Sequence, residues 1–185
     1  MMTQEKIHDA YVAVELKKGL LEALRSGLKA SLNDRELVCE DSSAALHVSV
    51  AYGEGEVVRE RLEDALSAIA NQGFRARVTG FDILEGLETP FDYLVLCIDS
   101  EALGSVVDEV GECMRVREFN GGLHHHVSLL RFKKDLTPDV RIVLKELNAS
   151  FGAANAIGRS FHVEGGRVCV FTPDRECCAR ISMIA

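Results

Sequence analysis

The sequence lacks the signals of a secreted or membrane protein. Its 185 residues contain no apolar run of membrane-spanning length, and the first ten, MMTQEKIHDA, contain no apolar signal-peptide core. None of the six cysteines stands in a CxxC pair or at another zinc-like spacing. We therefore expect a protein of the reduced cytoplasm that makes no contact with membranes.

Basic charge is also scarce. The chain has 21 Lys and Arg residues against 29 Asp and Glu residues, which gives a net charge of −8. A long polyanion would be repelled on average, and this disfavours long RNA or DNA as a partner. Residues 115–134 depart from this average, because they carry five basic residues against the single Glu118, a local charge of +4. A small anionic ligand is therefore compatible with the sequence.

The hydrophobic pattern predicts a mixture of strands and helices. With 47% hydrophobic residues, the chain can fill the core of one domain. Apolar residues that recur every three or four positions predict helices, and alternating or short apolar runs predict strands. We expect strands at 11–16, 46–52, 74–84, 91–99 and 123–132, helices at about 19–32, 56–72, 103–114 and from 137, a turn at 53–55, and a closing hairpin of 160–164 with 167–172.

This order of elements occurs twice. Tyr11 and Tyr93 open corresponding strands, and the offset between them nearly equals the offset between His47 and His126. Such a repeat predicts an α+β fold of two pseudo-symmetric lobes, each a mostly antiparallel sheet with helices on its outer face, around a central cleft. We expect a single bilobal domain over 1–185, with lobes of approximately 1–88 and 89–185 that can exchange strands. His47 and His126 would then lie on opposite sides of the cleft.

Two of the expected strands carry the same tripeptide. His47-Val48-Ser49 and His126-Val127-Ser128 are each followed by an aliphatic residue. Side chains two positions apart on a strand share a face, so each motif directs an imidazole and a hydroxyl the same way. The valines then face the opposite side, where a core can bury them. The motifs predict a polar face on an apolar backing, built twice.

Two H-x-[ST]-hydrophobic motifs about eighty residues apart resemble the two-histidine (2H) phosphoesterases, which include the RNA 2′,3′-cyclic phosphodiesterases, also known as bacterial "2′-5′ RNA ligase" proteins. The resemblance covers most of the chain. YVAVEL looks like the family's opening strand, LHVSVAYG and HHVSLLRF look like its two motifs, and SFHVEGGRVCVFT looks like its closing strand pair. The chain departs from the family in using Ser at both hydroxyl positions, where Thr is common, and in its triple-His run.

The resemblance implies a metal-independent, cofactor-free phosphodiesterase that hydrolyses a 2′,3′-cyclic phosphate or a small 2′-linked or cyclic (oligo)nucleotide. Histidine suits the roles of base and acid, because its unperturbed pKa near 6.5 allows either protonation state near neutrality. We expect His47, Ser49, His126 and Ser128 to be catalytic, with the hydroxyls donating to phosphate oxygens. Which histidine is the acid and which the base is not given by the sequence.

Four further residues are expected to bind substrate. Tyr11 matches a base-stacking position of the family, although a half-buried core tyrosine fits the pattern equally. Tyr52 could stack on a base and Arg131 could steady a phosphate. Strict alternation would turn both away from the cleft, unless the strands end or twist there. His124 would line the rim of the cleft, while His125 on the other face is expected to be structural.

Two alternatives stay open. His124 and His126 share a face and could form a three-His zinc site with His47, but this leaves the paired serines unexplained. A nucleotide-binding or sequestering protein without turnover, such as a viral or phage antagonist of nucleotide signalling, would keep the same cleft. The sequence does not give the oligomeric state.

Overall fold

The computed structural model of the chain describes residues 6–17, 19–43, 45–86, 89–117, 125–154, 156–164, 166–171 and 177–182. Most described strands belong to one sheet, in which each pair of hydrogen-bonded strands runs antiparallel. Its order is β10 (Ser160–Val163), β6 (Phe74–Leu84), β7 (Phe91–Asp99), β9 (His126–Lys133), β4 (His47–Glu54), β2 (Tyr11–Glu15), β11 (Arg167–Phe171) and β12 (Cys177–Ser182). Short strands β3 (Cys39–Asp41) and β8 (Arg115–Val116) pair with β9 and β4, and β1 (Lys6–His8) pairs with β5 (Glu56–Val58).

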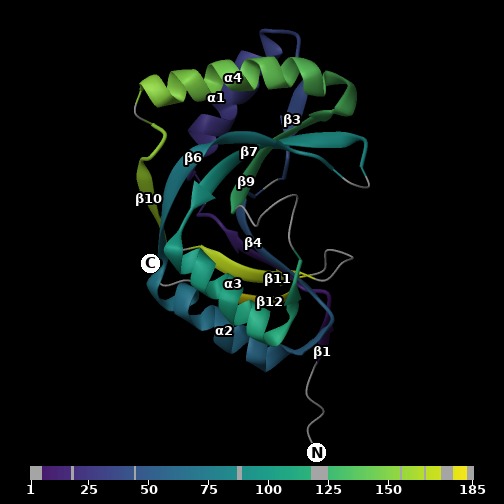
Figure 1. Cartoon of the computed structure of the whole chain (residues 1–185), viewed down its shortest axis with the longest axis vertical. Helices are drawn as coiled ribbons and strands as arrows, with labels where there is room; N and C mark the ends of the chain where they lie inside the picture. Colours follow the sequence, from purple (N-terminus) through teal and green to yellow (C-terminus); the bar gives the residue numbers. More distant parts are fainter. Residues whose placement is uncertain are drawn as a thin grey trace, which may run out of the picture.

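Within the described residues, four α-helices cover the two halves of this sheet (Figure 1). α1 (Glu22–Asn33) and α4 (Thr137–Ala153) pack on the half that contains β3, β9 and β6, and a 3-10 turn (Lys134–Leu136) precedes α4. α2 (Arg59–Gln72) and α3 (Glu101–Cys113) pack on each other and on the half that contains β4, β11 and β12. The α+β fold with helices over antiparallel strands is therefore confirmed. The lobe boundary near residue 88 stays a prediction, and both halves of the sheet receive elements from both sides of it.

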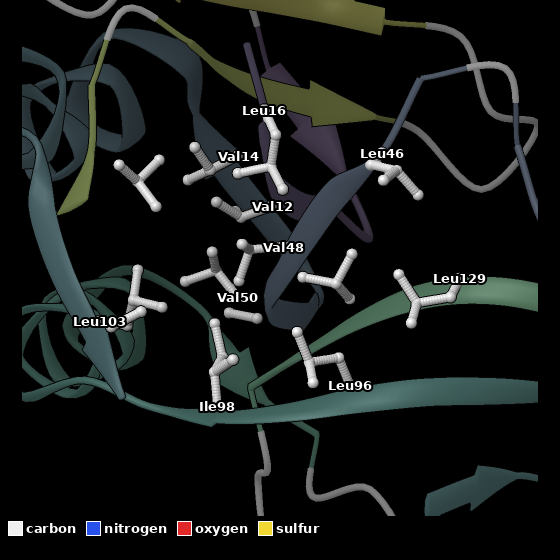
Figure 2. Close-up of a cluster of buried hydrophobic side chains, with 14 of the residues drawn as sticks. Val12, Val14, Leu16, Leu46, Val48, Val50, Leu96, Ile98, Leu103 and Leu129 are labelled. Atoms are coloured by element: carbon white, nitrogen blue, oxygen red, sulfur yellow. The ribbon is translucent and has the colours of Figure 1, made fainter. Parts of the chain in front are cut away.

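A continuous apolar core explains why these elements hold together. The inward residues of β2 and β4, such as Val14 and Val48, are fully buried and belong to the same cluster as Leu103 of α3 and Ile98 of β7 (Figure 2). The apolar stripes expected on the helices are buried as well, for example Val140, Val143 and Leu144 of α4. Burial of this surface from water provides the main free energy of folding.

The sequence predicted some elements to the residue and missed others. β6 and β7 have the bounds expected for them, 74–84 and 91–99. The closing hairpin is wrong: β10 pairs with β6, whereas β11 lies between β2 and β12, so the two strands join different halves of the sheet. The turn expected at 53–55 is shorter, because β4 continues to Glu54 and only Gly55 turns, at φ +99°.

The two motif strands lie closer than expected. We expected β4 and β9 on opposite sides of a cleft, but they are hydrogen-bonded neighbours, through the pairs Val48–Val127 and Ser49–His126. The two halves of the sheet meet at this short ladder. None of the described helices is long and apolar enough to cross a membrane.

Candidate active site

The register between β4 and β9 brings the two motifs together. Ser49 lies opposite His126 and Val48 lies opposite Val127, and this register, continued by one residue, sets His47 opposite Ser128. Residues that are directly opposite on antiparallel strands share a face, with Cβ atoms about 4.5–5.5 Å apart. The four side chains therefore form a compact square with imidazoles on one diagonal and hydroxyls on the other. We call the sheet face that carries them the motif face.

The motif face is partly accessible and its reverse is buried. His47, Ser49 and Ser128 are half-buried, and His126 is 9% exposed. Val48 and Val127, which alternate with them, are fully buried. The Nδ1 atom of His47 lies 3.5 Å from the Ala45 carbonyl oxygen, at the limit of a hydrogen bond. The predicted polar face on an apolar backing is what the structure contains.

A β-bulge in β4 brings Tyr52 onto the motif face. β2 pairs its Ala13 with Ser49 but its preceding residue, Val12, with Ala51, so Val50 is an additional residue in β4. An additional residue shifts the alternation of side chains by one. Tyr52, which lies opposite Tyr11, consequently faces the same side as Ser49. Strict alternation had placed it on the other side.

An equivalent bulge in β9 does the same for Arg131. β7 pairs Val95 with Ser128 but Leu94 with Leu130, so Leu129 is the additional residue. Arg131, opposite Tyr93, then shares the face of Ser128. The bulge follows the His-Val-Ser tripeptide in both strands, and both residues expected to bind substrate are thereby on the motif face.

Tyr11 contacts both polar residues of the first motif. Its hydroxyl is 2.6 Å from the Ser49 hydroxyl, and either oxygen can be the donor. Its ring stands edge-on to the His47 ring, with centroids 6.1 Å apart and planes at 80°. The ring of Phe171 in β11 also packs against it, with centroids 6.0 Å apart. Tyr11 therefore contacts the catalytic candidates Ser49 and His47 directly. Neither sequence-based interpretation of Tyr11, as a base-stacking residue or as a core residue, anticipated these contacts.

Arg131 is held in place by its neighbours. The Nε atom and one terminal nitrogen of Arg131 donate hydrogen bonds to the Glu40 carboxylate of β3, at 2.9 and 2.6 Å. The Arg131 guanidinium also lies 4.9 Å from the centre of the Phe91 ring. The Arg131 and Glu40 side chains are 40% and 59% exposed. An exposed pair of this kind contributes at most about 1 kcal/mol, so a phosphate can compete for the guanidinium.

The sequence analysis missed several residues on the motif face, among them Glu15, Cys97 and Tyr93. Glu15 lies opposite His47, Cys97 lies opposite His126, and Tyr93 lies opposite Arg131. Burial, with a smaller contribution from the Asp82 charge, raises the pKa of the Cys97 thiol to about 11, so the thiol is neutral. The repeat could have indicated the glutamate and the cysteine, since the offset between them equals the offset between the two tyrosines that open the corresponding strands.

The three consecutive histidines, 124–126, do not share one environment, because β9 begins at the third of them. His124 lies outside the described residues, so its expected place at the cleft rim stays a prediction. His125 is 8% exposed and lines a hollow at the start of α3 with Ser100, on the opposite side from the motif face. Among the described residues, no three His, Cys, Asp or Glu side chains gather as a metal site would need. The three-His alternative depends on His124.

The architecture is the two-histidine phosphoesterase fold that the paired motifs indicated. Usb1 of Kluyveromyces marxianus matches with a TM-score of 0.60 at 11% identity, over 96% of this chain and 99% of that one, and a second structure of that protein is with uridine monophosphate. TT0787 of Thermus thermophilus matches with a TM-score of 0.54 at 15% identity, over 95% of this chain and 97% of that one. Neither a protein-family model nor a curated protein sequence matches the chain. At these identities the likeness shows the fold alone.

Proposed function

We propose that the protein is a metal-independent phosphodiesterase that hydrolyses a 2′,3′-cyclic phosphate or a small 2′-linked or cyclic (oligo)nucleotide. The observation that carries this proposal is the register of β4 and β9, which sets Ser49 opposite His126 and, continued by one residue, His47 opposite Ser128 on one partly accessible face. Each imidazole then has a hydroxyl beside it and the second imidazole across the diagonal.

This square suits in-line displacement at phosphorus. Diagonal neighbours on paired strands are about 7–8 Å apart, which leaves room for a phosphoryl group between the two imidazoles. One imidazole removes a proton from the attacking water, and the other protonates the departing ribose oxygen. The Ser49 and Ser128 hydroxyls donate to the non-bridging oxygens, where negative charge accumulates.

The surroundings of the square favour small nucleotides. Tyr11, Tyr52 and Tyr93, the three tyrosines of the chain, all lie on the motif face, where aromatic rings can contact a base or ribose. The net charge of −8 would repel a long polyanion. The structure of K. marxianus Usb1 with uridine monophosphate adds support for a ligand of this size.

The test is a substrate panel assayed with excess chelator. It contains the four 2′,3′-cyclic nucleotides, 2′-5′ oligoadenylate and several cyclic oligonucleotides. A His47→Ala/His126→Ala double variant purified in parallel controls for contaminating nucleases. We expect chelator-resistant turnover of at least one substrate by the wild type and none by the double variant. Calorimetric binding of a ligand that stays intact for hours would instead establish the sequestering alternative, and turnover abolished by chelator would favour a metal site.

A further inference from the structure

Ser42 lies where one edge of β9 changes from one partner strand to another. The paired residues of β9 and β4 end at Val127, and the pairs of β9 with β3 begin at Leu130. Between them, the backbone N–H of Ser42 donates to the Leu129 carbonyl oxygen at 3.2 Å, and the Ser42 hydroxyl donates to the Ser128 carbonyl oxygen. A single residue therefore satisfies the two carbonyl groups that lie between the two ladders.

These two carbonyl groups belong to the β-bulge of β9. In a regular strand, successive carbonyl groups point to opposite edges, so one neighbouring residue does not reach two of them in a row. Leu129 is the additional residue of β9 in its pairing with β7, and it breaks this alternation. Ser42 thus binds both carbonyl groups of the bulge, on the edge of β9 that faces away from β7.

The residues on either side of Ser42 are bound to α1. Asp41, which precedes it, accepts a hydrogen bond at 2.9 Å from Lys29. The carbonyl oxygen of Ser43, which follows it, accepts one at 2.9 Å from Arg25, a buried side chain of the same helix. Because both flanking residues are held by α1, Ser42 is fixed from both sides while it binds the backbone of β9.

We propose that Ser42 is a positioning residue, which holds the bulge of β9 in the conformation that turns Arg131 onto the motif face. This inference rests on the proposed function, because Arg131 is the residue expected to steady the substrate phosphate. The bulge shifts the alternation of side chains between Ser128 and Arg131, so a loosened bulge displaces the guanidinium relative to the square of motif side chains. Ser42 acts through the backbone of β9 and not on the substrate.

Glu40 does not replace Ser42 in this role. Glu40 binds the end of the Arg131 side chain, through an ion pair that is exposed to solvent and can be exchanged for a phosphate. The Ser42 hydroxyl binds the backbone of half-buried Ser128, and its removal leaves that carbonyl group without this partner. The two contacts therefore hold different parts of β9, and only the contact with Ser42 sets the bulge.

Ser42→Ala tests the proposal, because it removes the hydroxyl and keeps the backbone N–H. Ser67→Ala is the matched control, since the exposed Ser67 hydroxyl on α2 also donates to a backbone carbonyl, that of Asp64. We expect Ser42→Ala to lower kcat/KM about two- to tenfold for the best substrate of the panel, mainly through a higher KM. Ser42→Thr, which keeps the hydroxyl, should recover most of this loss, and Ser67→Ala should keep the wild-type value.

A double-mutant cycle with Arg131→Ala identifies the residue through which Ser42 acts. We expect Ser42→Ala to have little further effect on kcat/KM in the Arg131→Ala background, because the guanidinium that it displaces is already absent. A loss that is equally large in both backgrounds would overturn the proposal. A Ser42→Ala variant that unfolds at a lower urea concentration but keeps the wild-type kcat/KM would also overturn it, since the role of Ser42 would then be structural alone.

The Nε–H signal of Arg131 gives an NMR readout that needs no turnover. It is assigned by its loss in Arg131→Lys, and it reports the hydrogen bond to Glu40. We expect the signal to shift in Ser42→Ala and to stay in place in Ser67→Ala. An unchanged signal in Ser42→Ala would refute the positioning role alone. A wild type that hydrolyses nothing in the substrate panel would refute the proposed function, and the NMR comparison would still decide whether Ser42 positions Arg131.

Discussion

The hydrogen bond between Tyr11 and Ser49 makes a quantitative prediction. Its 2.6 Å length and half-buried position link the Ser49 hydroxyl to a second hydroxyl. If Ser49 accepts from Tyr11 while donating to phosphate, each bond polarises the other. Tyr11→Phe removes only the hydroxyl and keeps the ring that packs on His47. A net hydrogen bond of about 0.5–1.5 kcal/mol corresponds to a roughly two- to thirteenfold decrease in kcat.

The assay is a double-mutant cycle on kcat for the best substrate of the panel. We expect Tyr11→Phe to lower kcat with KM nearly unchanged, and to have no further effect in the Ser49→Ala background, because the two hydroxyls act as a unit. The matched cycle uses Tyr93→Phe and Ser128→Ala, between which the described structure contains no hydrogen bond, and it should be additive. Additive losses at Tyr11 and Ser49, or a Tyr11→Phe variant that loses only affinity, would refute this reasoning.

Two further predictions concern stability and thiol chemistry. Gly73 ends α2 at φ 64° and ψ −167°, which glycine alone adopts readily, and an added Cβ would collide with the Val163 carbonyl oxygen. Gly73→Ala should lower the free energy of unfolding in urea by about 2–3 kcal/mol, while Gly104→Ala, in the open interior of α3, should raise it by up to about 1 kcal/mol; equal effects would contradict the geometry. The Cys97 thiol, with its pKa raised to about 11, should resist alkylation at pH 8 in the folded protein and react after denaturation, as mapped by mass spectrometry. Rapid labelling of native Cys97 would show that burial and Asp82 do not suppress its thiolate.

The local pattern of the sequence predicted much of the site. The repeat of His-Val-Ser set both motifs on strands, and the structure places all four side chains on one face. The bulges were not predicted, although the sequence contains a signal for them. In HVSVAY and HVSLLR two apolar residues follow the serine, so the alternation shifts by one before Tyr52 and Arg131. Both pairs, Val50 with Ala51 and Leu129 with Leu130, are buried.

Features that depend on distant pairing were not predictable in this way. Glu15 and Cys97 flank the histidines only because β2 and β7 pair outside the motif strands in a particular register. The prediction of a β10–β11 hairpin was wrong, because a short glycine-containing link also allows the two strands to pair with other strands. β10 pairs with β6, and β11 pairs with β2. β3 is three residues long and was not among the expected strands, yet its Glu40 accepts hydrogen bonds from Arg131. Such arrangements are decided by the packing of the whole chain.

The most direct test of the account is the rate of phosphodiester hydrolysis when each imidazole is removed separately. We predict that His47→Ala and His126→Ala each lower kcat at least about a hundredfold, and that the double variant is no slower than the slower single variant. His162→Ala, which removes an exposed imidazole on β10, should keep the wild-type rate. If either motif variant kept more than about a tenth of the wild-type rate, the paired imidazoles of β4 and β9 would not be the acid and base of this protein.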